Sequence, residues 1–179
     1  MTSHQRVNQD SRNVEYYTPP EIIEAARRTM GGIDLDPASC EAANRPVQAG
    51  WIYTEAEEGL NQKWTGNVWM NHPFKRGRNH LWINKLVEEY SMGRVRQACC
   101  ITWASTSEQW FRPLLHYPQC FPEGRTDYLL PDGTVKKGAT KGSVITYLGP
   151  NRVQFTKHFS KIGVVKIPLY YHGGDDFQS

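Results

Sequence analysis

The tetrapeptide Asn71-His72-Pro73-Phe74 carries the residue types needed to hold a planar amino group for reaction. The Asn71 side-chain oxygen and a neighbouring backbone carbonyl can each accept one of the two amino hydrogens. The Phe74 ring can stack on the base that carries the group, and Pro73 fixes the backbone so that the acceptors converge. Taken alone, these residues favour a plain strand-to-loop turn that buries Phe74, so the interpretation depends on the rest of the chain.

The tetrapeptide is expected at the end of a strand. The apolar run Val68-Trp69-Met70 precedes it and predicts a buried strand, and a basic stretch follows it. Lys75, Arg76 and Arg78 in that stretch would meet phosphates if a nucleic-acid base lay in the site. A solvated positive loop is the alternative interpretation.

Two further predicted strands end in residues that suit a ligand. Residues 33–39 predict a strand that ends in Asp36-Pro37-Ala38, where small residues let the backbone approach a ligand and the acid can bind an ammonium group. Residues 97–103 are apolar throughout, which is typical of a central parallel strand. Because ligands bind at the carboxyl ends of such strands, we expect Asp36, Asn71 and Trp103 to converge.

A helix is predicted near the start of the chain. Thr18 is a good N-cap, Pro19 suits the first helical position, and Glu21 completes a capping box. Ile22, Ile23, Ala26 and Met30 follow at helical spacing, and Gly31-Gly32 ends the helix. Asn44, further on, suits either a contact to a cofactor ribose or the capping of a loop.

A hairpin is predicted in the last third of the chain. Residues 123–130 lead into the turn Pro131-Asp132-Gly133, and residues 143–148 are expected to return as the second strand. Lys136, Lys137 and Lys141 would then lie at a basic tip that could grip a phosphate backbone.

Strands alternate with helices before this hairpin, which predicts an α/β sandwich with a mainly parallel central sheet. We expect a single domain over residues 16–169. Residues 1–15 are predicted to form a flexible lead-in, and residues 170–179 a tail.

The composition is typical of a soluble globular protein, with 39% hydrophobic and 22% charged residues in 179. No apolar run approaches the roughly 20 residues that span a bilayer, so we expect no membrane association. The net charge of +3 permits a nucleic-acid partner without requiring one. The four cysteines lack metal-ligand spacing and His72 and His80 have no third ligand nearby, so we expect reduced thiols, a cytoplasmic location and no metal.

The order and spacing of these elements resemble the phage-type DNA adenine methyltransferases, the Dam-like family of phages and prophages. Asn71-His72-Pro73-Phe74 resembles the Asn-Pro-Pro-Tyr/Phe motif of amino-group DNA methyltransferases, with His72 in place of the first proline. The resemblance runs from about Tyr16 to Ile167. It implies a Rossmann-like methyltransferase fold, S-adenosylmethionine as cofactor and DNA as partner.

The resemblance also implies roles for individual residues. It implies that Asn71, His72 (through its carbonyl), Pro73 and Phe74 are catalytic. The residues that it places around the cofactor are Tyr17, Thr18, Pro19, Asp34, Asp36, Pro37, Ala38, Glu58 and Asn71. Glu58 matches the element that binds the cofactor's adenine, although three clustered glutamates also suit a solvated loop.

Other functions remain open at this stage. The methylated base could be cytosine, or the nucleic acid RNA, because the tetrapeptide does not distinguish them. His72 and the glycine-poor loop after Asp36 also suit a non-catalytic nucleic-acid-binding protein on a degenerate methyltransferase fold. The lack of a Gly-rich loop with Lys-Ser/Thr argues against a phosphate-cradling nucleotide enzyme. The oligomeric state and recognition sequence are not determined by these patterns.

Overall fold

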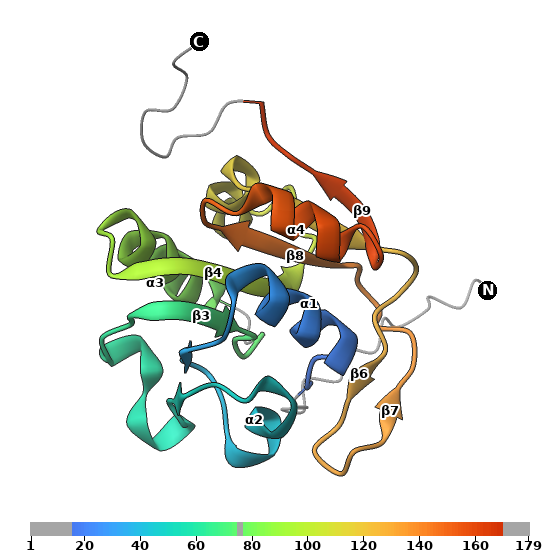
Figure 1. Ribbon diagram of the computed structural model, residues 1–179. Coiled ribbons are helices and arrows are strands. Elements are labelled where there is room, and N and C mark those ends of the chain that lie inside the picture. The colour runs from blue at the N-terminus through green and yellow to red at the C-terminus, as the bar shows by residue number, and fades with distance from the viewer. Residues whose placement is uncertain (1–15, 75–76, 170–179) are drawn as a thin grey trace, which may run out of the picture.

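A seven-stranded sheet forms the centre of the computed structural model, which describes residues 16–74 and 77–169 (Figure 1). The strands lie in the order β2-β1-β3-β4-β8-β5-β9. Their bounds are β1 Leu35–Asp36, β2 Trp51–Ile52, β3 Gly66–Met70, β4 Val95–Trp103, β5 Gln119–Pro122, β8 Ser143–Leu148 and β9 Gly163–Lys166.

Most strands of this sheet run in one direction. β2, β1, β3 and β4 pair in parallel. β8 runs antiparallel to both β4 and β5, and β9 runs antiparallel to β5, so that only β8 and β9 are reversed. The prediction of an α/β fold around a mainly parallel sheet is confirmed.

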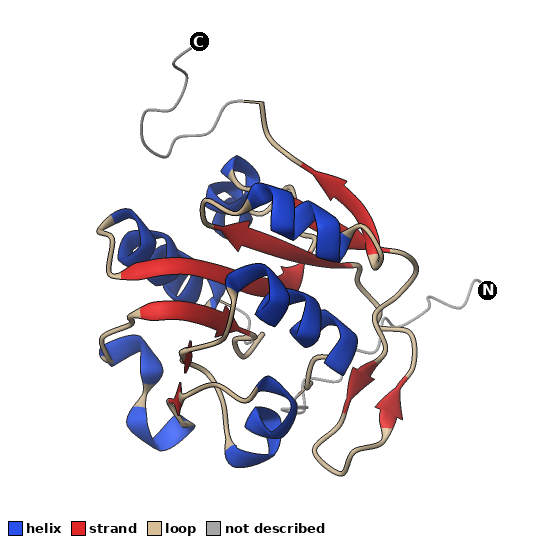
Figure 2. Ribbon diagram, viewed as in Figure 1, coloured by secondary structure: helices blue, strands red, loops and turns tan. Residues whose placement is uncertain are grey.

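Helices cover both faces of the sheet (Figure 2). Helices α1 (Pro20–Met30), α2 (Glu41–Val47) and α4 (Arg152–Phe159) contribute to the core on one face. Helix α3 (Asn79–Ser91) and the 3₁₀ helix η3 (Gln109–His116) contribute to the core on the other. Residues 98–101 of β4 alternate between the two cores, which explains why this stretch of the strand is apolar on both faces.

Helix α1 begins one residue later than the predicted capping box requires. Its N-cap is Pro19, and no side chain caps its first turn. The Thr18 hydroxyl instead accepts a hydrogen bond from the Asn71 amide, 3.2 Å away, so the prediction of Thr18 as N-cap is wrong. Gly31 ends the helix as predicted, in the left-handed conformation at φ 75° that glycine adopts without strain.

The hairpin differs from the prediction in its second strand. β6 (Tyr128–Leu129) pairs with β7 (Val135–Lys136) around the turn at Pro131-Asp132-Gly133. The predicted return strand, β8, instead lies between β4 and β5 in the main sheet. Every residue of β8 is buried, and a mostly apolar strand that is buried on both faces is more stable inside a sheet than in an exposed hairpin.

The β6–β7 hairpin stands beside the main sheet (Figure 1) and is joined to the start of the described chain. Tyr17 and Leu129 exchange two backbone hydrogen bonds, of 2.8 and 2.9 Å. This bridge places residues 16–18 next to the hairpin. In residues 16–74 and 77–169, no helix combines the length and apolar character needed to cross a membrane.

Candidate active site

The carboxyl ends of β1, β3 and β4 open into one cavity of about 1020 Å³. Because these strands are parallel, their ends meet at the same edge of the sheet. Asp36, Asn71 and Trp103 all line the cavity. Other predicted site residues in its wall are Tyr17, Thr18, Pro37, Ala38, Glu58, His72, Pro73, Phe74 and Arg78.

The amide of Asn71 is held in one orientation. Its Nδ2 donates to the backbone carbonyl of Tyr16 at 2.7 Å and to the Thr18 hydroxyl at 3.2 Å. A backbone carbonyl only accepts hydrogen bonds, so the NH₂ end of the amide must face Tyr16. The Asn71 Oδ1 has no hydrogen-bond partner in the described part of the chain and is therefore left to accept from a ligand.

His72 is buried and joins the tetrapeptide to helix α3. Its Nε2 lies 3.2 Å from the Oδ1 of Asn79, and its ring stacks on Trp82. An amide oxygen accepts, so Nε2 carries the proton and Nδ1 is the unprotonated nitrogen. Nδ1 is buried without a hydrogen-bond partner among the described residues. Burial lowers the pKa of His72 to about 4, so the imidazole is neutral at pH 7.

A row of four aromatic rings, which we call the aromatic wall, begins at the tetrapeptide. Its rings are Phe74, Trp103, Tyr128 and Tyr16, with neighbouring centroids at 4.7, 5.7 and 5.6 Å in that order. Three of the rings line the cavity, and the fourth, Tyr128, is buried outside the cavity lining. Tyr128 is fully buried, and its hydroxyl lies 2.8 Å from the Ser143 Oγ. Such rings give planar bases an apolar surface to stack on.

The opposite end of the cavity carries a buried acid. Asp36 is 2% exposed and accepts a hydrogen bond from the Ala38 N–H at 3.2 Å. Burial raises its pKa to about 7, although the hydrogen bonds from Ala38 and Ser39 oppose the shift. No cationic side chain pairs with it in the ranges that the structure describes. A bound cation would therefore find a carboxylate with no competing partner.

Two short 3₁₀ helices close this acidic end, η1 (Glu55–Glu57) and η2 (Gly59–Asn61). Gly59 packs so closely on β1's following turn that a Cβ there would lie 1.9 Å from the Pro37 carbonyl oxygen. Glu58 is exposed at φ 49°, and its carboxylate accepts from the Asn61 amide at 2.7 Å. Glycine at position 59 is thus required for these helices to approach Pro37.

Some predicted residues are not brought to the cavity. Asp34 lies at the other edge of the sheet, where its carboxylate pairs with Arg96 and accepts from the Asn67 N–H, both at 2.8 Å. Pro19 does not line this cavity and serves as the N-cap of α1. Asn44 caps a loop through two hydrogen bonds with the Ala49 backbone, which is the second of its two predicted roles.

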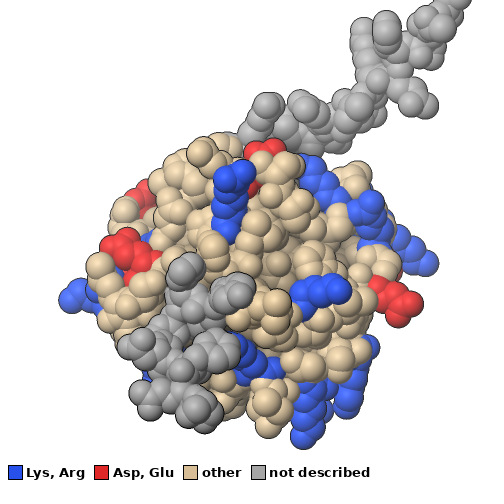
Figure 3. Space-filling view, turned by 90° about the horizontal axis from the view of Figure 1, so that it is seen from above, with Lys and Arg blue, Asp and Glu red and all other residues tan. Residues whose placement is uncertain are grey.

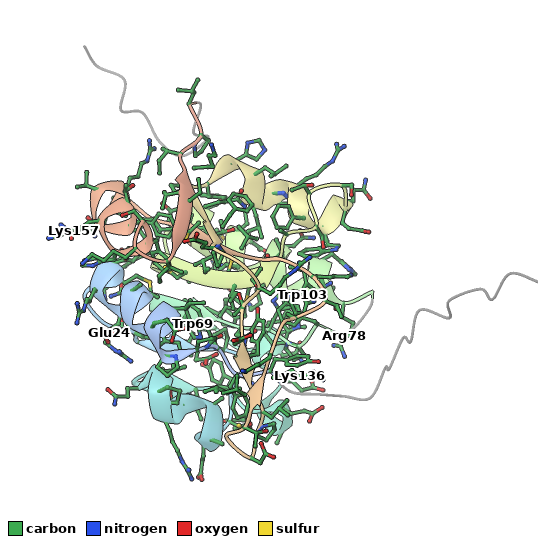
Figure 4. All side chains as sticks on the ribbon, turned by 90° about the vertical axis from the view of Figure 1, so that its right-hand side faces the viewer. Glu24, Trp69, Arg78, Trp103, Lys136 and Lys157 are labelled. Carbon is green, nitrogen blue, oxygen red and sulfur yellow. The ribbon has the colours of Figure 1, made fainter. Side chains whose placement is uncertain are left out.

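The predicted phosphate contacts are divided between two places. Arg78 lines the cavity, whereas Lys136, Lys137 and Lys141 are exposed on and after β7. Figure 4 shows Arg78, Trp103 and Lys136 on one side of the molecule, with Glu24 and Lys157 on the other. Lys75 and Arg76 lie outside the described residues. The face seen in Figure 3 carries Lys and Arg side chains scattered among uncharged residues, with a few Asp and Glu side chains near its rim.

Sequence reasoning missed the carbonyl of Tyr16 and the ring of Tyr53. Tyr53 lines the cavity just after β2, and its backbone joins Asp36 to Ser39 through hydrogen bonds of 3.0 and 2.9 Å. The run Trp51-Ile52-Tyr53 could have identified a fourth strand end there. A backbone carbonyl leaves no trace in a sequence, so the contact of Tyr16 could not have been found.

Among the described residues, no three His, Cys, Asp or Glu side chains gather in a group that could hold a metal ion. Cys40, Cys99, Cys100 and Cys120 are all free thiols. A family model described as "DNA N-6-adenine-methyltransferase (Dam)" matches residues 5–156, most of the chain. No curated protein matches the chain.

Proposed function

The chain belongs to the DNA N-6-adenine-methyltransferase (Dam) family, and we propose that it transfers a methyl group from S-adenosylmethionine to N6 of adenine in DNA. The observation that carries this proposal is the amide of Asn71, fixed by Tyr16 so that its oxygen is free in a cavity lined by aromatic rings. We further propose that the fold is the Rossmann-like methyltransferase sandwich, which is supported by the parallel order of β2, β1, β3 and β4.

The acidic end of the cavity fits S-adenosylmethionine. The buried Asp36 carboxyl lacks a cationic partner in the described chain and suits the ammonium group of the cofactor. Glu58, on the same wall, is exposed and suits an amino group that donates hydrogen bonds, such as that of an adenine ring. Tyr17, Thr18, Pro37 and Ala38 would enclose the remainder. When bound, the cofactor supplies a methyl group on a positively charged sulfur.

Asn71 and His72 would prepare the amino nitrogen for attack. The Asn71 Oδ1 accepts one amino hydrogen, and the backbone carbonyl of His72 accepts the other. These two hydrogen bonds favour a tetrahedral nitrogen whose lone pair is available to the methyl carbon. Pro73 holds the two acceptors in place, and Phe74 stacks on the base. The chain therefore acts by positioning and charge placement, without a covalent intermediate on the protein.

The adenine must leave the duplex to reach this cavity, because its amino group is otherwise enclosed in a base pair. We propose that the DNA backbone then lies along the side of the molecule that carries Arg78 and the β6–β7 hairpin (Figure 4). Lys136, Lys137 and Lys141 would bind phosphates there. Lys75 and Arg76, outside the described residues, are also proposed to bind phosphates. Such contacts position the DNA but do not select its sequence.

The test is incubation of the purified chain with unmethylated DNA and labelled S-adenosylmethionine, followed by mass spectrometry of the nucleosides. We expect methyl on deoxyadenosine. Asn71→Ala should lose at least about 100-fold in rate while it still binds cofactor, because one of two acceptors is removed. Asn151→Ala, outside the cavity, serves as the matched control.

Each other result has a defined meaning. Methyl on deoxycytidine would keep the mechanism and change the target base. Transfer to RNA in preference to DNA would change the substrate. Failure to bind S-adenosylmethionine would favour a non-catalytic nucleic-acid-binding protein. Wild-type methylation by Asn71→Ala would refute the role of the tetrapeptide.

A further inference from the structure

Trp103 is in van der Waals contact with the ring that the proposed function assigns to base stacking. The centroids of Phe74 and Trp103 are 4.7 Å apart, with 33° between the ring planes. Both rings line the cavity and both are half-buried. The pair therefore occupies the part of the cavity beside Asn71 that a target base would need.

Two tilted rings with centroids 4.7 Å apart leave no room for a third ring between them. Successive stacked bases lie about 3.4 Å apart, so a base held between two rings requires roughly 7 Å between the outer ring planes. The pair as observed is closed, and a base can enter only if one ring moves away from the other.

The two rings are anchored very differently. Trp103 is the last residue of the nine-residue strand β4, and it pairs with Ser143 of β8. Its ring also meets the edge of Tyr128, which is fully buried and joined to Ser143 through its hydroxyl. Phe74 lies in the loop that follows β3, outside any strand pairing, and its ring contacts that of His72 with centroids 5.1 Å apart. Trp103 is thus the fixed surface, and Phe74 is the ring that can separate from it.

The order of the strands makes the target base, and not the cofactor, the ligand of Trp103. β3, which carries Asn71 at its end, lies between β1, which ends at Asp36, and β4, which ends at Trp103. The acidic end of the cavity and Trp103 are therefore on opposite sides of Asn71. A base whose amino group reaches the Asn71 Oδ1 can stack on Trp103 without overlapping the cofactor.

We infer that the flipped adenine is held between Phe74 and Trp103, so that Trp103 is a second stacking surface for the target base. This inference rests on the proposed function and adds a substrate-binding residue to it. Phe74 parts from Trp103 as the base enters, and each ring then covers one face of the base. The contact between the rings in the absence of DNA keeps water from two apolar surfaces that would otherwise be exposed.

A mutant cycle separates this role from a purely supporting one. The value of kcat/KM for unmethylated DNA would be measured for wild type, Phe74→Leu, Trp103→Leu and the double variant. If each ring stacks on the base, each single change lowers kcat/KM by roughly 10- to 100-fold, and the double variant is clearly weaker than either single variant. If Trp103 only supports Phe74, its removal has no further effect once Phe74 is gone.

Three further measurements control for effects of the substitutions other than the loss of base stacking. Trp103→Phe should retain most of the activity, because a phenyl ring also stacks. The Kd for S-adenosylmethionine should be unchanged in all variants, which would show that the cavity is still folded. Trp51→Leu, on an exposed tryptophan of β2 outside the cavity, should behave as wild type.

Two outcomes would overturn the inference alone: a Trp103→Leu variant with the kcat/KM of wild type, or a double variant no weaker than Phe74→Leu. Absence of adenine methylation by the wild-type chain would instead refute the proposed function, and the inference with it. The two failures are therefore distinguishable in one experiment.

Discussion

The two ends of the cavity differ in how the protein holds their polar side chains. At the Asn71 end, the protein fixes the orientation of its polar side chains: Tyr16 and Thr18 hold the Asn71 NH₂ group, Asn79 binds the His72 Nε2, and aromatic rings line the rest of the surface. At the Asp36 end, a two-residue strand leads to a buried carboxyl that no cationic side chain of the described chain pairs with. The protein thus pre-organises the end assigned to the target base and leaves the other end to be completed by a ligand.

The largest loss of activity should come from replacing the Asn71 NH₂ group, a hydrogen-bond donor, by an oxygen that only accepts. Asn71→Asp places a carboxylate against the Tyr16 carbonyl, which can only accept, so two oxygens repel each other at a separation of about 2.7 Å. We expect kcat at pH 8 to fall by about 100- to 1000-fold. The loss should be partly reversed as the pH is lowered, because a protonated carboxyl can donate to Tyr16.

Rates of wild type and Asn71→Asp between pH 5.5 and 8.5 test this expectation. The control is the Kd for S-adenosylmethionine in both proteins over the same range. If the variant were as active as wild type at pH 8, the orientation of the amide would not matter, and the Asn71 end would not be pre-organised in the way described.

A smaller effect is expected from Asp36→Asn, which should weaken cofactor binding but stabilise the ligand-free protein. The variant should bind S-adenosylmethionine about 10- to 100-fold more weakly, because a charged partner for the ammonium group is lost. Without ligand, it should be more stable than wild type at pH 8. The pKa of Asp36 is raised in the folded chain from 3.8 to about 7, so wild type loses stability as the pH rises from about 4 to 7.

The stability difference should reach at most about 4 kcal/mol and stay constant above pH 7. Thermal unfolding of both proteins from pH 4 to 8 measures it, and isothermal titration gives the cofactor affinity. In wild type the affinity should increase as the pH rises through 7, while in Asp36→Asn it should not. If the two proteins were equally stable at pH 8, burial of the Asp36 carboxylate would not destabilise the ligand-free protein. The Asp36 end would then not differ from the Asn71 end in the way described.

The smallest effect is expected at His72, and its pH dependence has the opposite sign. The pKa of His72 is lowered from 6.5 to about 4 in the folded chain, so the unfolded chain takes up the proton first. Wild type should therefore lose up to about 3 kcal/mol of stability from this group as the pH falls from 6.5 to 4. His72→Gln keeps a donor for Asn79 and should lack this loss.

Unfolding of His72→Gln and wild type in urea at pH 4, 5, 6 and 7 checks this expectation. The two curves of stability against pH should diverge below pH 6.5. His80→Gln, on an exposed histidine, is the matched control and should follow wild type. Parallel curves for wild type and His72→Gln would show that the imidazole is not held neutral.

The sequence predicted the site residues well where they lie directly at the carboxyl end of a strand. Asn71 follows the apolar run Val68-Trp69-Met70, and Asp36 ends the predicted strand that begins at Ile33. This pattern predicted both the parallel strands and the sheet edge where they meet. The hairpin was partly wrong because its turn is a local signal, whereas the partner of β8 depends on which strands remain unpaired elsewhere in the fold. Thr18 suits a cap locally, but a contact 53 residues away takes its hydroxyl.

The contacts of residues 16–18 also bear on how the chain folds. The amide of Asn71 is oriented by groups 53 and 55 residues earlier, and the same short segment pairs with Leu129 in the last third of the chain. Contacts between residues so distant in sequence require long loops to close, which slows their formation relative to local helices and turns. A refolding chain could therefore regain its helical signal before Asn71 acquires its orientation, so recovered methylation would report completion of the fold more faithfully than recovered helix content.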